Sequence, residues 1–215
     1  MMPEGPEVRT LTNKLKPAIG MRLLNINFIS GRYVNHQRPV GFDSFRKTMS
    51  DYDASKDEYN DKTDLIRQWN CKGKFIWIEL DDGVRDDPAD DYLRSVWITL
   101  GMTGRFFSEK EVDKSSPSLR WYLELYDYNS QKTRRIYYSD RRNFGTLKFS
   151  LSAAELEKKI ASLGPDMLHD DTTEDIFLEC LSSYRARSSP NICKLLMNQK
   201  VCSIFNFHFL IVFLP

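Results

Sequence analysis

Residues that could hold a metal are scarce in this sequence. Its 215 residues include four cysteines and three histidines, and no two cysteines form a Cys-x-x-Cys pair. Tetrahedral zinc sites need closely spaced pairs of such ligands. We therefore expect no metal and no cofactor, and we expect reduced thiols because nothing in the sequence indicates secretion. The residues concerned are Cys71, Cys180, Cys193, Cys202, His36, His169 and His208.

A strong net charge and long apolar runs are also lacking. Lysine and arginine number 31 against 30 aspartates and glutamates, so the overall charge gives no indication of a nucleic-acid partner. Glu4, Glu7 and Arg9 interrupt any apolar run at the N-terminus, which argues against a secretory signal there. The apolar run at residues 205–214 is too short to cross a bilayer. We expect a protein that is not secreted and has no membrane partner.

What the sequence does have is enough apolar material for a core. Hydrophobic residues make up 41%, which argues against global disorder, and the length suits one large or two small domains. Acidic residues crowd positions 51–64 and 81–91, which predicts exposed loops. Residues 134–148 combine five basic residues with Tyr137, Tyr138 and Phe144, a mixture that suits a loop facing DNA.

Alternating apolar and polar residues predict an antiparallel sheet in residues 1–150. The clearest case is residues 119–125, and Leu24, Ile26 and Phe28 alternate with asparagines in the same way. A short N-terminal helix and a polar insertion or long loop at residues 43–64 complete this part. We expect an α+β fold in which the helix packs on a two-layer antiparallel β-sandwich. The other predicted strands are residues 75–80, 96–100, 135–138 and 146–149.

After about residue 150 the pattern changes to helices. Ser152-x-x-Glu155 is a capping box, Thr173 precedes a second helix at residues 174–181, and a third begins near Pro190. We therefore predict two domains, a β-sandwich domain at residues 1–150 and a helical domain at residues 151–215.

The opening residues, Met-Pro-Glu-Gly-Pro-Glu at positions 2–7, have the most direct chemical meaning. If Pro3 were the N-terminal residue, its secondary amine would form an iminium with an aldehyde, with the Glu4 carboxyl beside it. Gly5 suits a helix N-cap and Pro6 the first helical position. The positive end of that helix would disfavour the protonated amine. The alternative is an ordinary helix start after a proline-rich opening.

Six pieces of the sequence together resemble the formamidopyrimidine-DNA glycosylase/endonuclease VIII family of base excision repair enzymes. They occur in the family's order and at roughly its spacing over residues 2–203. They are Met-Pro-Glu-Gly-Pro-Glu-Val at positions 2–8, Gly73-Lys74, Leu100-Gly101-Met102-Thr103-Gly104, Asp140-Arg141-Arg142-Asn143-Phe144-Gly145, Leu163-Gly164-Pro165-Asp166 and Leu195-Leu196-Met197-Asn198-Gln199-Lys200.

This resemblance implies a bifunctional DNA glycosylase and AP lyase. Its partner would be double-stranded DNA with oxidised bases or abasic sites, and we expect a monomer in the nucleus or another DNA-containing compartment. Pro3 would be the Schiff-base nucleophile, Glu4 the general acid and base, and Glu7 would orient the N-terminus. Lys74 would contact phosphate at the active site, although a lysine before a strand is usually a surface residue.

The resemblance also implies residues that fill the hole left by a flipped nucleotide. Met102, Arg142 and Phe144 match these positions, and the alternative for Met102 and Phe144 is core packing. Asn143 stands where the family often has a second arginine for phosphate. Lys194 could contact phosphate from the third helix, or lie on a solvated surface.

The last residues depart from the family. Its helix–two-turn–helix module has a Gly-x-Gly-Asn loop, whose glycines are absent after Ser203, and no match to its C-terminal finger is present. We expect a C-terminally truncated helical domain that is aberrant from about residue 204, through a frameshift or retained intron, with a true short paralogue as the alternative. Because Met1-Met2 would not be trimmed to expose Pro3, we also predict that translation starts at Met2.

The choice of lesion and two other functions stay open. Glu4-Gly5-Pro6 resembles the endonuclease VIII-like branch, so we expect a broad range of oxidised bases and abasic sites. One alternative is a truncated, non-catalytic DNA-binding product of the same family, whose loss of phosphate contacts would weaken its grip on DNA. The other is an N-terminal-proline tautomerase that uses the amine as a base.

Overall fold

The computed structural model of the chain describes residues 5–35, 37–49, 64–81, 91–166 and 173–183. In these residues eight antiparallel strands form one hydrogen-bonded sheet in the order β5-β7-β6-β1-β2-β3-β4-β8. The strands are β1 (Arg22–Phe28), β2 (Leu65–Lys72), β3 (Phe75–Asp81), β4 (Tyr92–Thr99), β5 (Arg105–Ser108), β6 (Leu119–Asp127), β7 (Lys132–Ser139) and β8 (Thr146–Ser152).

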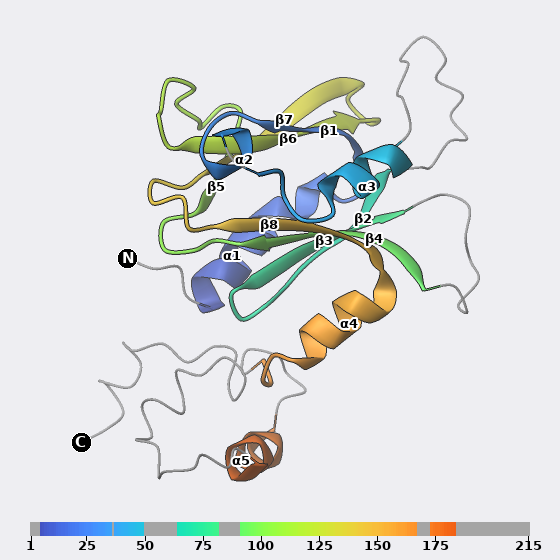
Figure 1. Cartoon of the computed structure of the whole chain (residues 1–215), viewed down its shortest axis with the longest axis vertical. Helices are drawn as coiled ribbons and strands as arrows, with labels where there is room; N and C mark the ends of the chain where they lie inside the picture. Colours follow the sequence, from blue (N-terminus) through green and yellow to red (C-terminus); the bar gives the residue numbers. More distant parts are fainter. Residues whose placement is uncertain (1–4, 36, 50–63, 82–90, 167–172, 184–215) are drawn as a thin grey trace.

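The sheet folds over on itself at the junction of β1 and β2. These two strands share a single registered pair, Arg22 with Leu65, whereas β1 and β6 stay paired along most of their length. The strands β5, β7, β6 and β1 therefore form one layer and β2, β3, β4 and β8 the other (Figure 1). The predicted antiparallel β-sandwich with an N-terminal helix is confirmed.

The main core fills the space between the two layers. Leu119, Trp121, Leu123 and Leu125 of β6 are buried in strict alternation, as the sequence predicts. Trp121, Leu123 and Leu125 share one buried cluster with side chains of the other layer, among them Ile76, Ile78, Val96 and Ile98 of β3 and β4. Each fully buried side chain of this size stabilises the fold by about 1.5–3 kcal/mol.

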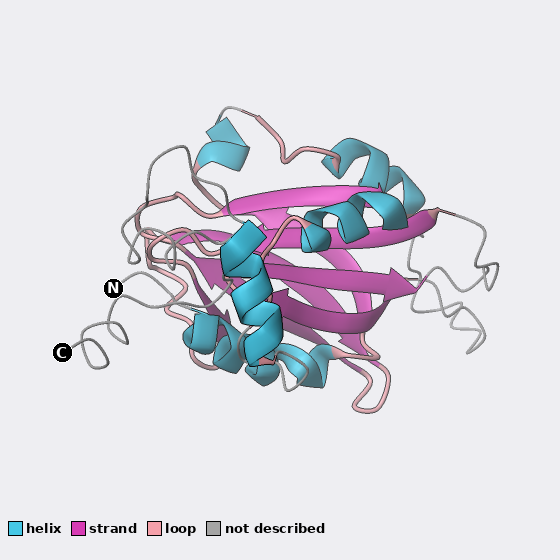
Figure 2. Cartoon of the chain, turned by 90° about the horizontal axis from the view of Figure 1, so that it is seen from below, coloured by secondary structure: helices cyan, strands magenta, loops and turns pink. Residues whose placement is uncertain are grey.

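Helix α1 (Gly5–Leu15) packs against β2 and is followed by the 3-10 helix η1 (Lys16–Ala18). Val8 and Leu15 are buried on the inner face of α1. In the perpendicular view the strands run across the picture, so their turns gather at the two ends of the sandwich (Figure 2). Turns that are far apart in the sequence can therefore form one site only if they lie at the same end of the sandwich.

Two expectations for the sandwich are wrong in detail. In β1 a bulge between Leu23 and Asn25 shifts the alternation, so Leu23 is buried where Leu24 was expected. Residues 42–48, which overlap the expected polar loop, form helix α3 (Phe42–Thr48), and its Phe42 and Phe45 pack on Phe149. Two apolar residues in a seven-residue helix are too few to give a periodic pattern.

Other parts of the sequence-based prediction were incomplete or lie outside the described residues. Strands β2 and β5 were not predicted, and neither was the one-turn helix α2 (Arg32–Asn35). Most of the expected loop at residues 43–64 and the third helix near Pro190 lie outside the described residues.

The described helical region begins at α4 (Ala153–Ala161). Ser152 caps this helix, since its Oγ accepts a hydrogen bond from the Glu155 N–H at 3.1 Å. The predicted capping box is only half formed, because the Glu155 carboxylate accepts from Ser150 Oγ at 2.5 Å and pairs with Lys148 instead. On its inner face, Leu156 joins a second cluster with Phe75, Trp77 and Trp97.

Helix α5 (Glu174–Ser183) begins at the cap that the sequence predicts. Thr173 Oγ1 accepts a hydrogen bond from the Ile176 N–H at 3.4 Å. Among the helices that the structure describes, none is both long and apolar enough to cross a membrane.

Candidate functional site

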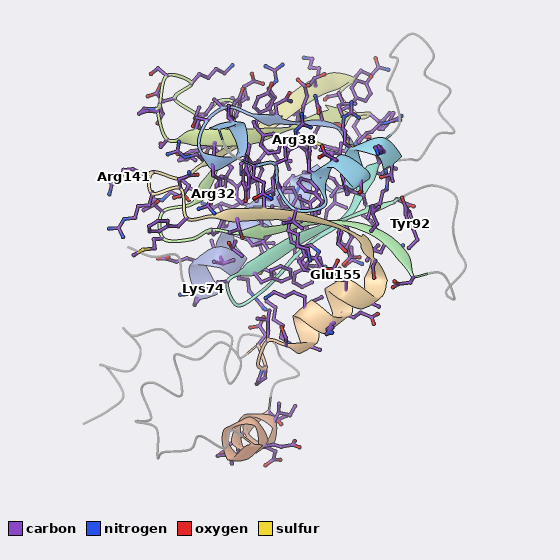
Figure 3. All side chains as sticks on the ribbon, viewed as in Figure 1. Arg32, Arg38, Lys74, Tyr92, Arg141 and Glu155 are labelled. Atoms are coloured by element: carbon purple, nitrogen blue, oxygen red, sulfur yellow. The ribbon has the colours of Figure 1, made fainter. Side chains whose placement is uncertain are left out.

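One end of the sandwich collects motifs that are far apart in the sequence. The β2–β3 turn with Gly73 and Lys74, the turn at residues 101–104, the turn at residues 140–145 and the start of α1 all lie there (Figure 1). Lys74 and Arg141 are seen at this end in Figure 3. We call the turns at residues 101–104 and 140–145 the paired turns.

A buried carboxylate joins the paired turns. Asp140 is 1% exposed. Its Oδ1 accepts hydrogen bonds from the Thr103 hydroxyl and from the Arg142 N–H at 3.2 Å, and its Oδ2 accepts one from the Gly145 N–H at 2.7 Å. The Arg142 N–H also reaches Thr103 Oγ1, at 3.1 Å. One side chain therefore holds groups from both turns.

Glycines let the paired turns approach each other. Gly101 has a φ of +60°, and a Cβ there would lie 2.8 Å from the Phe144 carbonyl carbon. A Cβ on Gly145 would lie 1.9 Å from the Tyr138 hydroxyl oxygen. A larger residue at position 101 or 145 would overlap these atoms, which explains why both positions hold glycine.

The paired turns bring together the three residues expected to fill a hole in DNA. Phe144 is 56% exposed, so it does not pack in the core. Arg142 is exposed and its Nη1 lies 3.0 Å from the sulfur of Met102, which is half-buried. A thioether and a guanidinium are thus in contact, and an exposed aromatic ring lies two residues from Arg142 on the same turn. An aromatic or thioether wedge can enter a base stack, and a guanidinium can bond to base edges.

Two arginines that sequence reasoning missed hold the turn at residues 140–145 from behind. Arg120 of β6 donates from Nε to the Asp140 carbonyl at 2.8 Å and from Nη1 to Ser30 Oγ at 2.7 Å. Arg32 of α2 donates to the carbonyl of Asn143, a residue with a φ of +55°. No local pattern marks either arginine, because each comes from a distant segment of the chain.

Lys74 and Glu7 occupy the same end of the sandwich. Lys74 is half-buried and follows Gly73, whose φ of +56° makes the tight β2–β3 turn. Glu7 is exposed in the first turn of α1 and lines a groove of about 430 Å³ between α1 and the segment that carries Thr103 and Arg105. Glu7 therefore lines the same groove as one of the paired turns.

Three of the expected site residues lie outside the described residues. They are Pro3, Glu4 and Lys194. The described chain begins at Gly5, the first residue of α1, so Pro3 and Glu4 directly precede it in sequence.

A second groove, of about 630 Å³, lies along another part of α1 and β2. Arg9 of α1 pairs with Asp166 at 2.5 Å across it, and Lys72 donates to the Ile160 and Leu163 carbonyls at 3.2 Å. These contacts give the Leu163-Gly164-Pro165-Asp166 motif a structural role, because they fix the end of α4 and the segment after it on α1 and β2. Burial raises the pKa of the Cys71 thiol in this groove, which keeps it protonated.

Metal ligands do not gather in the part of the chain that the structure describes. No group of three or more histidine, cysteine, aspartate or glutamate side chains there could hold a metal ion.

Comparison with known proteins gives one family. The family model described as formamidopyrimidine-DNA glycosylase N-terminal domain matches residues 2–147. The formamidopyrimidine-DNA glycosylase of Corynebacterium efficiens is 24% identical over 203 residues, covering 94% of this chain and 62% of the relative. That of Deinococcus radiodurans is 26% identical over 213 residues, covering 96% and 62%. The chain thus spans 62% of the length of these two relatives.

Solved structures share the fold. MutM in complex with DNA containing carbocyclic 8-oxo-G superposes with a TM-score of 0.64 at 19% identity, covering 97% of this chain and 66% of MutM. Lactococcus lactis Fpg in complex with DNA containing FAPY-dG superposes with a TM-score of 0.63 at 20% identity, covering 95% and 64%. At these identities the likeness concerns the fold.

Proposed function

The chain belongs to the formamidopyrimidine-DNA glycosylase family, and from this premise we propose that it excises oxidised bases from double-stranded DNA and cleaves the abasic site. In the proposed reaction the Pro3 nitrogen bonds to C1′ of the damaged nucleotide as the base departs with its bonding electrons. Glu4 protonates the sugar ring oxygen and opens the ring, which leaves an iminium between Pro3 and C1′.

Strand cleavage then follows from the iminium. It acidifies the C2′ protons, and loss of one expels the 3′ phosphate by β-elimination. A second, δ-elimination expels the 5′ phosphate and leaves a gap. The positive end of α1 lies next to Pro3 in sequence and disfavours the protonated amine, so more of the nucleophile is available.

The observation that carries this proposal is the presence of exposed Arg142, exposed Phe144 and half-buried Met102 together on the paired turns. A base inside a duplex cannot reach a nucleophile, so the nucleotide must leave the stack and the hole must be filled. Apolar and cationic side chains that project together from a rigid surface suit this task. They stand at the same end of the sandwich as Lys74 and the start of α1.

The remaining proposed roles follow from position and charge. Lys74 supplies a compact ammonium for a DNA phosphate near the reacting sugar. Glu7, on the groove beside α1, orients the N-terminus through hydrogen bonds. Lys194 contacts phosphate from the helical domain. We further propose that the protein works as a monomer without a cofactor, in the nucleus or another compartment that holds DNA.

We also propose the endonuclease VIII-like branch, and with it a broad range of oxidised bases, from the Glu4-Gly5-Pro6 sequence. The relatives named above are formamidopyrimidine-DNA glycosylases, so the branch rests on these three residues alone. Parallel excision assays on an oxidised pyrimidine and a ring-opened purine distinguish the two branches.

Borohydride trapping tests the chemistry. A protein translated from Met2 and trimmed of that methionine, so that Pro3 is its N-terminal residue, is mixed with a duplex carrying an abasic site and reduced with borohydride. We expect a covalent adduct whose yield falls strongly in Pro3→Gly, because a primary amine replaces the secondary one, and that forms more slowly in Lys74→Ala. Salt-dependent DNA binding without an adduct would contradict the proposal and favour a non-catalytic DNA-binding protein.

A further inference from the structure

We propose that Asp140 is a positioning residue that couples the paired turns, so that Met102, Arg142 and Phe144 enter the DNA as one rigid unit. The inference rests on the proposed function and adds to it a residue that would touch neither DNA nor the reacting atoms. Asp140 lies beneath the projecting side chains and is 1% exposed.

The hydrogen bonds of Asp140 are divided between the two turns. One carboxylate oxygen accepts from Thr103, the neighbour of Met102, and the other accepts from the N–H of Gly145, the neighbour of Phe144. The same carboxylate also accepts from the N–H of Arg142 itself. Each of the three projecting residues is therefore tied to Asp140 directly or through the adjacent residue.

The backbone of Asp140 is itself held in place. Its N–H donates to the Ser118 carbonyl at 2.8 Å, and its carbonyl accepts from Arg120 Nε at 2.8 Å. Hydrogen bonds to an ionised acceptor are about twice as strong as neutral ones. The position of the carboxylate is therefore fixed by the sandwich, and its hydrogen bonds fix both turns relative to the sandwich.

Rigidity matters here because a flipped nucleotide leaves a hole of fixed size. If the paired turns moved independently, Met102 could enter the stack without Arg142 or Phe144, and the flipped state would lose part of its support. Functional side chains must be held within about 0.5 Å of their productive positions by the residues behind them. A carboxylate shared by two turns meets that need, because both of its oxygens accept hydrogen bonds. The side-chain amide of an asparagine does not, because its NH2 group would face one of the three donors and repel it.

The test separates positioning from a general loss of stability by using two substrates. A duplex with an oxidised base requires flipping and filling of the hole. A single-stranded oligonucleotide with a preformed abasic site requires neither, because it has no stack to fill. Excision is measured on the first and borohydride trapping on the second, for the protein translated from Met2 and trimmed to expose Pro3, and for its variants.

For Asp140→Asn we expect excision from the duplex to fall by about tenfold to a hundredfold, while trapping on the single strand stays within about twofold of the parent. Thr103→Val removes the two hydrogen bonds that the Thr103 hydroxyl makes across the turns, to Asp140 and from the Arg142 N–H, and leaves the carboxylate in place. It should likewise lower excision from the duplex and leave trapping on the single strand nearly unchanged. This second variant tests the proposal even if Asp140→Asn does not fold.

Asp127→Asn is the matched control. Asp127 is 5% exposed and accepts hydrogen bonds from the Asn129 N–H at 3.0 Å and from Ser130 Oγ at 2.8 Å, so it also stabilises a turn. That turn joins β6 to β7 and lies at the end of the sandwich opposite the paired turns. Any loss in Asp127→Asn should be equal for excision from the duplex and for trapping on the single strand. Equal losses on both substrates in the folded Asp140 and Thr103 variants, or no loss on either, would overturn the inference. Absence of trapping in the parent protein would instead refute the proposed function.

Discussion

At the scale of single residues, the site depends on glycines at positions where a larger side chain would not fit. Gly145 lies under the hydroxyl of Tyr138, which stacks on Trp121 with ring centroids 4.7 Å apart. Burial raises the pKa of Tyr138, so its hydroxyl stays protonated and can donate to the Leu100 carbonyl at 3.3 Å. Tyr138 therefore links the glycine of one paired turn to the residue that precedes the other.

We expect Gly145→Ala to destabilise the protein by about 1–3 kcal/mol, because the new Cβ would overlap the Tyr138 hydroxyl and the stacked ring cannot move aside. Chemical denaturation followed by tryptophan fluorescence measures the change. Adding Tyr138→Phe removes the overlapping oxygen and should recover part of the loss. A double variant whose destabilisation equals the sum of the two single ones would contradict this account.

At the scale of elements, the start of α4 shows how a local signal is completed by a neighbouring strand. Ser152 caps the helix as its sequence predicts. Asp91, just before β4, supports the same helix end, since its carboxylate accepts from the Ala154 N–H at 2.6 Å and from Ser152 Oγ at 2.7 Å. These hydrogen bonds hold the pKa of Asp91 below its usual range. The cap thus joins α4 to the edge of the sandwich.

Ser152→Ala should lower the free energy of unfolding by about 1 kcal/mol, because the Glu155 N–H loses its partner. The urea midpoint of unfolding checks this, provided the slope of the transition is unchanged. Ser162→Ala, at the C-terminal end of α4, is the control and should have a smaller effect, since its hydroxyl only donates to the Lys159 carbonyl. Equal effects of the two variants would argue against a capping role.

At the scale of the whole molecule, the two ends of the sandwich serve different purposes. The end opposite the paired turns is held by Arg94, which is 2% exposed, pairs with Asp64 and donates to the Thr48 carbonyl at 3.1 Å and the Asp81 carbonyl at 2.8 Å. This one guanidinium connects α3, β3 and the segment that enters β2. The end with the paired turns instead exposes Phe144 and its neighbours. The buried Arg94–Asp64 pair and the exposed side chains of the proposed site therefore lie at opposite ends of the strands.

Arg94→Leu should destabilise the protein by about 3–5 kcal/mol, because Asp64 would keep a buried charge without its closest partner. Arg22, 3.9 Å from Asp64, can compensate only in part. Thermal and urea unfolding measure the loss. Arg134→Leu is the comparison: it removes the ion pair of an exposed arginine with Asp127 at 2.7 Å and should cost less than about 1 kcal/mol. Similar losses in both variants would show that burial of the pair does not matter.

The sequence by itself determined what depends on neighbouring residues. The alternation in β6, the caps at Ser152 and Thr173, and each single family motif are readable within a few positions of the chain. These features were predictable because hydrophobic periodicity and capping act over one or two turns of backbone. Met102, Arg142 and Phe144 could be named in the same way, from the motifs that contain them.

Only the tertiary structure decided what depends on distant residues. The bulge in β1, the burial of Phe42 and Phe45 on β8, and the clamp of Arg94 arise from contacts between segments far apart in the chain. The same holds for Asp140, whose motif was visible but whose task appears only when residue 103 is brought to its carboxylate. Local patterns carry no information on such pairings, because a hydrogen bond depends on distance in space and not on separation in sequence.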